Sequence, residues 1–191
     1  MTENASENGY LEGQILIAMP SMSDPRFKKT IILLCSHNEE GAMGIVLNKN
    51  LNVLTFEDLL DQLNIESNHA ARETGVHFGG PVETERGFVL HSTDKIHETS
   101  IVIDKDIALT ATLDILQSMA IGTGPLNSFF ALGYSGWGPG QLEREIQGNG
   151  WLVVDADRDL VFSQQLDGKW NAAIQKLGFD PGLLSTDLGH A

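Results

Sequence analysis

Short apolar runs alternate with polar, glycine-containing links along the first quarter of the chain. Residues 1–12 are polar and are expected to form a flexible tail. The apolar runs 14–19, 30–36 and 42–47 predict β-strands, and the second is apolar almost throughout, as is typical of a strand covered on both faces. The link 38–41 ends in glycine and predicts a hairpin between the last two runs.

Helical spacing of apolar residues predicts about four helices farther along the chain. The expected apolar stripes are Phe56, Leu59, Leu60 and Leu63; Leu109, Leu113, Leu116 and Ala120; Leu142 and Ile146; and Trp170, Ala173, Ile174 and Leu177. Thr55 is a good N-cap for the first helix, with Asp58 as its capping-box partner. Pro139 suits the first position of the third helix, because a residue there needs no amide donor. Gly178 is expected to end the last helix in a left-handed conformation.

The remaining short apolar segments predict more strands. They are residues 76–78, 86–91, 101–103, 129–134 and 151–154. No clear domain linker interrupts the chain after the tail. The expected fold is therefore a single compact α/β (α+β) domain over residues 13–191, with a mixed, mainly antiparallel sheet or partial barrel and about four flanking helices.

The charge balance of the chain is strongly acidic. The 191 residues include 26 acidic and 12 basic ones, which gives a formal net charge of −14. Nucleic-acid binding draws much of its affinity from Lys and Arg at phosphates, so this surplus argues against direct contact with nucleic acid. The small basic cluster of Arg26, Lys28 and Lys29 is interpreted as the solvated start of a strand.

Cysteine content and targeting signals favour a cytoplasmic protein without membrane spans. Cys35 is the only cysteine, so no intrachain disulfide can form, and its apolar surroundings predict a buried, unreactive thiol. The first residues have neither the basic start nor the apolar stretch of a signal peptide. No run approaches the roughly 20 apolar residues of a membrane helix.

Motifs for metal or nucleophilic chemistry fail at a required position. Residues 155–159 imitate the start of a calcium loop, but Leu160 replaces its glycine, so the segment is interpreted as an exposed acidic turn. The histidines are scattered, and no metal or cofactor is expected. Residues 133–137 resemble a nucleophile elbow, but Trp137 stands where the tight turn needs glycine.

Two glycine-rich turns remain as a candidate ligand site, with no catalytic residue assigned. A glycine turn before a helix offers unpaired amides, and Trp137 could present an aromatic face there. The alternative is that the glycines only shape tight turns and that Trp137 fills the edge of the core. The candidate ligand-binding residues are Gly79, Gly80, Pro81, His91, Ser135, Trp137, Gly138, Gly140 and Glu143.

Several ordered blocks resemble the YqgE/AlgH family of bacterial proteins. They are residues 13–20 (GQILIAMP), 24–27 (DPRF), 44–48 (GIVLN), 78–82 (FGGPV), 87–91 (GFVLH), 133–143 (GYSGWGPGQLE) and 149–152 (NGWL). The resemblance extends over about residues 13–185, and it implies a compact mixed α/β fold in a bacterial cytosol but no settled activity. Ser135 stands where the family more often has Ala, which argues against a serine nucleophile. Some members are labelled as transcriptional regulators of exopolysaccharide production.

Three functions follow from these observations. The favoured one is a non-enzymatic regulatory module that binds a small molecule or a protein partner, because glycine turns are present and a catalytic set is missing. The second is a regulator that contacts DNA, which predicts a steep salt dependence. The third is a hydrolase, for which His91, Glu143, Asn48 and Ser135 are the candidate groups.

Overall fold

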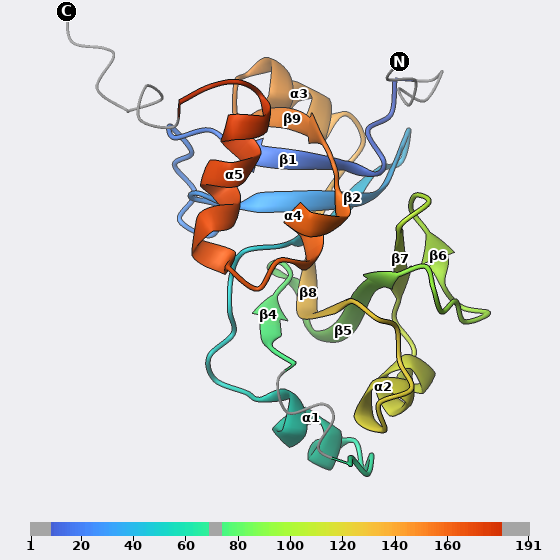
Figure 1. The fold of residues 1–191 in the computed structure, drawn as a ribbon. Coiled ribbons are helices and arrows are strands. Elements are labelled where there is room, and N and C mark those ends of the chain that lie inside the picture. Colours follow the sequence, from blue (N-terminus) through green and yellow to red (C-terminus); the bar gives the residue numbers. More distant parts are fainter. Residues whose placement is uncertain (1–8, 69–73, 181–191) are drawn as a thin grey trace, which may run out of the picture. The chain divides into compact units, whose positions relative to one another are not determined.

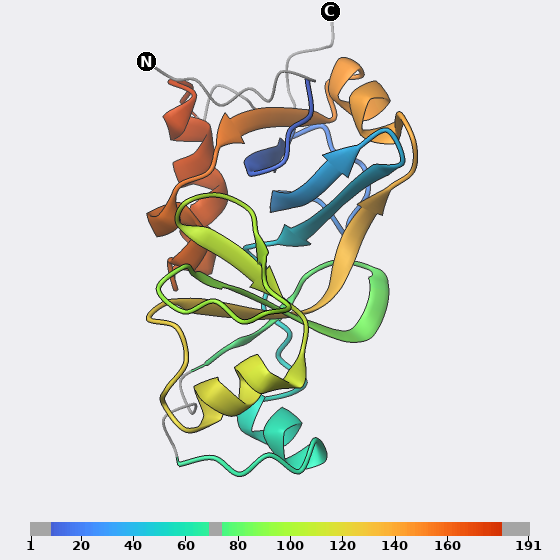
Figure 2. The ribbon, with the colours of Figure 1, turned by 90° about the vertical axis from the view of Figure 1, so that its right-hand side faces the viewer.

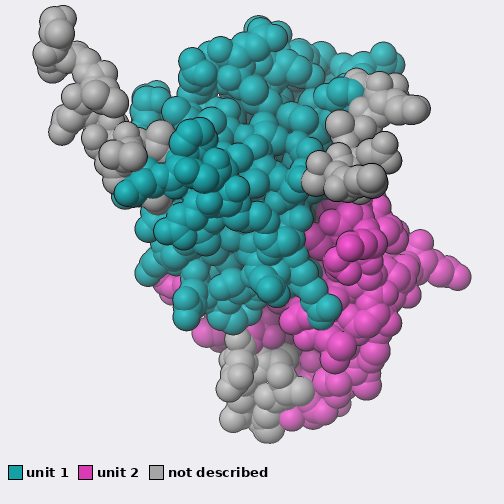
Figure 3. All heavy atoms as spheres, turned by 45° about the horizontal axis from the view of Figure 1, so that its top comes forward, with its two compact units in different colours: residues 1–48, 135–191 teal, residues 49–134 magenta. Residues whose placement is uncertain are grey.

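The chain divides into two compact units. The computed structural model describes residues 9–68 and 74–180. Unit 1 consists of residues 1–48 and 135–191, and unit 2 of residues 49–134 (Figure 3). The boundary at residue 134 falls within one strand, β8 (Ser128–Trp137), which therefore supplies residues to both units.

Unit 1 is built on an antiparallel sheet with the strand order β9-β1-β2-β3-β8 (Figure 1). Its strands are β1 (Gln14–Ala18), β2 (Ile31–Asn38), β3 (Gly41–Val46), β9 (Trp151–Asp155) and the last residues of β8. The first five residues of β2 are buried, as predicted for a strand covered on both faces. β2 and β3 form the predicted hairpin, in which Leu33 lies opposite Ile45.

Helices pack on this sheet through apolar and aromatic side chains. They are α3 (Gln141–Gln147) and α5 (Lys169–Lys176), the latter preceded by the 3₁₀ turn η1 (Leu166–Gly168), and a third helix, α4 (Arg158–Phe162), contacts α5. α5 contacts β1 and β2, and the indole Nε1 of Trp170 donates a 2.9 Å hydrogen bond to the carbonyl oxygen of Ala18. A buried hydrogen bond of this kind fixes the position of the helix along the strand.

Unit 2 contains a second group of strands in the order β6-β7-β5-β8, all antiparallel to their neighbours. Their bounds are β5 (Val82–Ser92), β6 (Ile101–Val102) and β7 (Ile107–Thr110), and β4 (Val76–Phe78) pairs with β8 in parallel. Two helices, α1 (Phe56–Gln62) and α2 (Leu113–Ala120), lie together at one end of the unit (Figure 2). Their buried faces share a core in which Phe56 meets the ring of Phe130 edge to face at 5.4 Å.

The helix signals read from the sequence are accurate where a cap residue accompanies a stripe. The side chain of Thr55 accepts a hydrogen bond from the Asp58 amide, and the Asp58 carboxylate accepts one from the Thr55 amide, which confirms the capping box. Gly178 has a φ of 77° directly after the last helix, as predicted. The mixed α and β composition and the mainly antiparallel pairing are also confirmed.

Two expected helix starts are wrong. Leu109 lies in β7 and not on a helix, because α2 begins only at Leu113. Pro139 lies in a turn, and α3 begins at Gln141, because Gly140 adopts a left-handed conformation with a φ of 67° and serves as the N-cap.

The acidic turn predicted for residues 155–159 is also wrong. Asp157 caps α4 by accepting a hydrogen bond from the Leu160 amide, so the described residues hold five α-helices where about four were expected. α4 spans only five residues, which is too short for a helical stripe to be recognised.

Candidate functional site

Trp137, the centre of the glycine bend, is part of the core of unit 1. Its side chain is 7% exposed and meets Trp151 edge to face at 6.0 Å. Both indole N–H groups donate to one carboxylate oxygen of Glu145, at 2.9 Å from Trp137 and 2.8 Å from Trp151. The polar edges of two buried indoles are thus satisfied by a single acidic side chain of α3.

The glycines next to Trp137 are explained in part by backbone geometry. A Cβ on Gly41 would collide with the carbonyl oxygen of Trp137 across the β3–β8 pair. Gly140 has the left-handed conformation that favours glycine. A Cβ on Gly138 would meet only the Gln141 side chain, at 3.9 Å, and the Gly138 amide donates to that side chain at 3.0 Å. These observations fit the interpretation that the bend is architectural, and ligand binding there stays a prediction.

Glu143 pairs with a histidine that sequence reasoning missed. The Nε2 atom of His37 lies 2.9 Å from Oε1 of Glu143, and the amide of Leu11 donates to Nδ1 of His37 at 3.0 Å. Because Nδ1 accepts, the proton of a neutral His37 is on Nε2 and points at the carboxylate. The backbone amide of Glu143 and the bond from His37 lower the pKa of this carboxyl. The pairing joins residues 106 positions apart, so no local signal in the sequence indicates it.

His91 is buried in unit 2 within a chain of hydrogen bonds. Its Nδ1 lies 3.0 Å from the carbonyl oxygen of Ser92 and therefore carries the proton. Its Nε2 then accepts from the Thr110 hydroxyl at 2.7 Å, and that hydroxyl lies 2.6 Å from the Ser100 hydroxyl. Burial is the main cause that lowers the pKa of His91, so the neutral form is favoured.

The other candidate groups have structural positions. Asn48 accepts from the Ile31 amide at 3.0 Å and donates to the Lys29 carbonyl at 2.8 Å, which ties the loop before β2 to the end of β3. Ser135 is fully buried in β8. Asn48, Ser135 and Glu143 belong to unit 1 and His91 to unit 2. The hydrolase set thus divides between the two units.

The glycine turn at residues 79–81 lies against β8 in unit 2. The Gly79 amide donates to the Leu132 carbonyl at 2.8 Å, and a Cβ on Gly79 would collide with the carbonyl oxygen of Gly133. Gly133 has a φ of 74° and approaches the carbonyl of Gly80 similarly closely. The glycines thus allow two backbone segments to cross, and Pro81 directly precedes β5. Their role in ligand binding stays a prediction.

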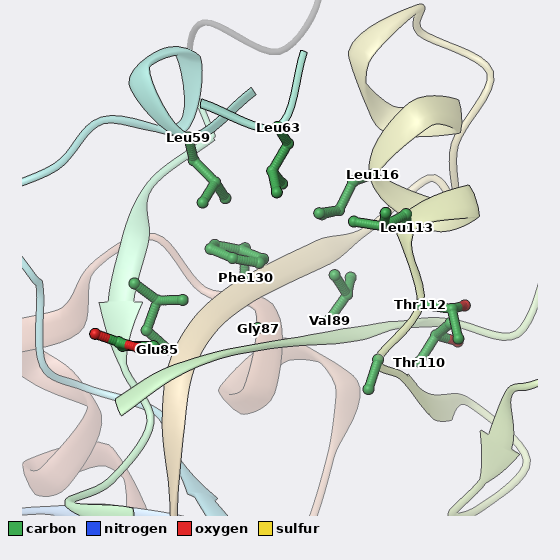
Figure 4. Close-up of a pocket in the computed structure, with 12 residues that line it drawn as sticks. Leu59, Leu63, Glu85, Gly87, Val89, Thr110, Thr112, Leu113, Leu116 and Phe130 are labelled. Atoms are coloured by element: carbon green, nitrogen blue, oxygen red, sulfur yellow. The ribbon is translucent and has the colours of Figure 1, made fainter. Parts of the chain in front are cut away.

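An apolar pocket of about 170 Å³ lies elsewhere in unit 2, and no predicted site residue lines it (Figure 4). Its lining comes from α1, α2 and strands β5, β7 and β8. The lining residues are Leu59, Leu63, Glu85, Gly87, Val89, Thr110, Ala111, Thr112, Leu113, Leu116, Phe130 and Leu132. Eight of the twelve are aliphatic or aromatic, and Glu85 is the only charged one.

At this pocket, β5 has a glycine, Gly87, next to the aromatic ring of Phe130. A Cβ on Gly87 would lie 3.0 Å and 3.1 Å from two carbons of the Phe130 ring. The ring therefore rests against the β5 backbone and leaves space between the apolar residues of the two helices (Figure 4). Figure 4 shows Glu85 on one side of Phe130 and Thr110 with Thr112 on the other.

Residues 9–68 and 74–180 contain neither a metal-type cluster nor a membrane-spanning helix. No three His, Cys, Asp or Glu side chains gather there as a metal site would require. Within the same residues, no helix has the length and apolar character needed to cross a bilayer. Cys35 is buried, and burial raises the pKa of its thiol, as expected for an unreactive cysteine.

The fold and pocket define a class of protein, namely a mixed α/β protein with a mainly antiparallel sheet and an apolar pocket beside it. The model of the AlgH-like family matches residues 15–182. The chain belongs to this family, and the predicted resemblance is confirmed.

Relatives and solved structures agree with this assignment. A UPF0301 protein of Rhodospirillum rubrum is 52% identical over 183 residues, covering 96% of this chain and 95% of its own. A UPF0301 protein of Methylocella silvestris is 52% identical over 190 residues, covering 95% and 92%. The solution structure of the AlgH protein of Pseudomonas aeruginosa is 38% identical with a TM-score of 0.80 and covers all of both chains. A crystal structure from Corynebacterium diphtheriae, 20% identical with a TM-score of 0.75 over 97% and 95% of the chains, shares the fold.

Proposed function

We propose that this protein is a non-enzymatic, cytoplasmic regulatory module whose ligand enters the apolar pocket of unit 2. The observation that carries the proposal is the pocket itself, with a volume of about 170 Å³ and a mostly apolar lining. A cavity of about 150 Å³ lined by Leu, Ile and Phe is known to stay dry and to bind benzene. The pocket is therefore large enough for one aromatic ring or a short branched alkyl group.

Charge limits the class of ligand further. Glu85 is exposed, and among the described residues it has no ion-pair partner. The chain also carries a net charge of −14. An anionic ligand would meet like charge at the pocket, so we propose a neutral or cationic ligand with a small apolar body.

The experiment uses three ring compounds of nearly equal size and different charge: toluene, benzylamine and benzoate. Each is titrated into the isotope-labelled full chain, and methyl and aromatic NMR signals are followed. Ligands this small bind with a dissociation constant on the order of 1 mM, because few atoms make contact. We expect saturable shifts at Leu116 and Phe130 with toluene and benzylamine, and weaker binding of benzoate.

Leu113 and Ile121 give a matched pair of variants. Leu113 lines the pocket and is 53% exposed, whereas Ile121 lies outside it at the other end of α2 and is 52% exposed. Leu113→Asp should weaken toluene binding severalfold, and Ile121→Asp should leave it unchanged. Absence of saturable shifts in the wild type, or equal losses in both variants, would show that the pocket is not a binding site.

A further inference from the structure

A second pocket, of about 360 Å³, lies in unit 1 beside α4 and α5. Four charged residues contribute to its lining: Asp157 and Asp159 come from the start of α4, and Lys169 and Lys176 come from the two ends of α5. Lys176 forms an ion pair with Asp157, and Asp159 is exposed. This pocket shares no residue with the apolar pocket of unit 2.

Lys169 is the unusual member of this lining. It is the first residue of α5 and only 2% exposed, so its ammonium group is almost entirely removed from water. Its Nζ donates a 2.7 Å hydrogen bond to the carbonyl oxygen of Val161, in the last turn of α4. Burial is the cause that lowers the pKa of Lys169 from 10.5 to about 7.

We propose that Lys169 is a reactive amine site that takes small aldehydes from the second pocket and holds them as imines. An amine reacts with a carbonyl group only through its neutral form. Near pH 7 about half of Lys169 is neutral, whereas an exposed lysine of pKa 10.4 is neutral in about one molecule in 2,500. Desolvation is a recognised way in which proteins activate lysine as a nucleophile.

The reaction balances without an oxidant or a further reactant. The Nζ lone pair attacks the carbonyl carbon, a C–N bond forms, and the carbonyl π electrons move to oxygen. A proton passes from nitrogen to that oxygen, which gives a carbinolamine. Loss of water then leaves a C=N bond, and protonation of the nitrogen gives an iminium ion.

The surrounding charges favour this class of adduct over others. An iminium ion is cationic and would lie in a pocket whose carboxylates are Asp159 and Asp157, the latter paired with Lys176. A carbamate or a phosphoryl adduct would instead place negative charge beside the same carboxylates. The volume of about 360 Å³ is large enough for an aldehyde of several carbons.

The test is site-resolved reductive alkylation of the full wild-type chain. The protein is treated with propanal and cyanoborohydride at pH 7 for short times, and each lysine is quantified by peptide mass spectrometry. The side chain of Lys105 is 89% exposed and serves as the accessible reference, and an added peptide with a free α-amino group shows that the reagents work. We expect Lys169 to be alkylated about tenfold faster than Lys105, with a rate that rises around pH 7 and then levels off.

Two variants separate reactivity from general accessibility of the pocket. Lys28→Arg changes an exposed lysine of unit 1 that does not line the pocket, and it should leave alkylation of Lys169 unchanged. Lys169→Met should remove the fast site and leave the rate at Lys105 as it was. If Lys169 stays unmodified while Lys105 and the added peptide react, its amine serves only to cap α4 and the proposal is overturned. Equal rates at Lys169 and Lys105 would overturn it as well.

Discussion

Replacing Lys169 by Met should change how the stability of unit 1 depends on pH. The pKa of Lys169 falls from 10.5 in water to about 7 in the folded chain because of burial. Between these two values the unfolded chain keeps a proton that the folded chain has lost. Stability therefore rises with pH across this window, because the unfolded state binds more protons.

The size of the effect follows from the same two values. One pKa unit corresponds to about 1.4 kcal/mol, so burial of the charged amine costs on the order of 5 kcal/mol below pH 7, and this cost disappears by about pH 10.5. Met fills similar space without a charge. It also loses the hydrogen bond to Val161, which costs about 1 kcal/mol at every pH. Lys169→Met should thus be the more stable form at pH 6.5, and its advantage should vanish or reverse near pH 10.5.

Tryptophan fluorescence reports on the unfolding of unit 1, which contains Lys169. All three tryptophans, Trp137, Trp151 and Trp170, belong to unit 1, as does Lys169. Urea unfolding of both proteins is measured from pH 6.5 to 10.5, and the difference in unfolding free energy is plotted against pH. The other titrating groups are present in both proteins, so their contributions cancel in this difference. A difference that stays constant with pH would refute the reasoning, because Lys169 would then keep its ordinary pKa in the folded chain.

Three further predictions concern unit 2. Gly87→Ala should push the Phe130 ring into the apolar pocket and weaken toluene binding severalfold by NMR titration, with a loss of about 1–3 kcal/mol in stability from overpacking. Because burial lowers the pKa of His91, the unfolded chain binds the extra proton first, so stability should fall as pH drops below about 6.5. His91→Gln should flatten that dependence in thermal unfolding measured from pH 5 to 8. Thr55→Ala removes the capping box of α1 and should cost about 1 kcal/mol in urea unfolding, whereas Thr84→Ala, at an exposed position on β5, serves as its control.

Elements with two agreeing local signals could be predicted from the sequence. α1 joins an apolar stripe to a capping box, and α5 joins a stripe to a left-handed glycine, so each was found within about a residue. α4 has an N-cap in Asp157, but its five residues are too few to show a helical stripe of apolar side chains, so the sequence does not predict it. Leu109 fits a helical spacing by coincidence, and the β7 pairing with Val89 and Leu90 on β5 decides its structure. Tertiary pairing overrides local pattern in such short segments.

The apolar pocket illustrates why a binding site is harder to predict than a core. Leu59, Leu63, Leu113 and Leu116 were recognised as apolar helical stripes, and a stripe is usually packed in a core. Whether two stripes meet fully or leave a gap depends on how far the strand beneath holds the helices apart. Here the ring of Phe130 lies on Gly87, and that contact joins residues 43 positions apart. A pattern in neighbouring residues therefore cannot indicate this contact.

Both proposed sites are expected to prefer neutral or cationic ligands to anionic ones, because acidic residues line each of them and the whole chain is acidic. Glu85 is the charged lining residue of the apolar pocket, and Asp157 and Asp159 line the pocket of Lys169. Each set of carboxylates disfavours an anionic ligand locally, and the net charge of −14 disfavours its approach at long range. Added salt should therefore weaken the preference for benzylamine over benzoate, because screening acts on the charges and not on the shared ring. A preference that is indifferent to salt would instead assign the selectivity to the shape of the pocket.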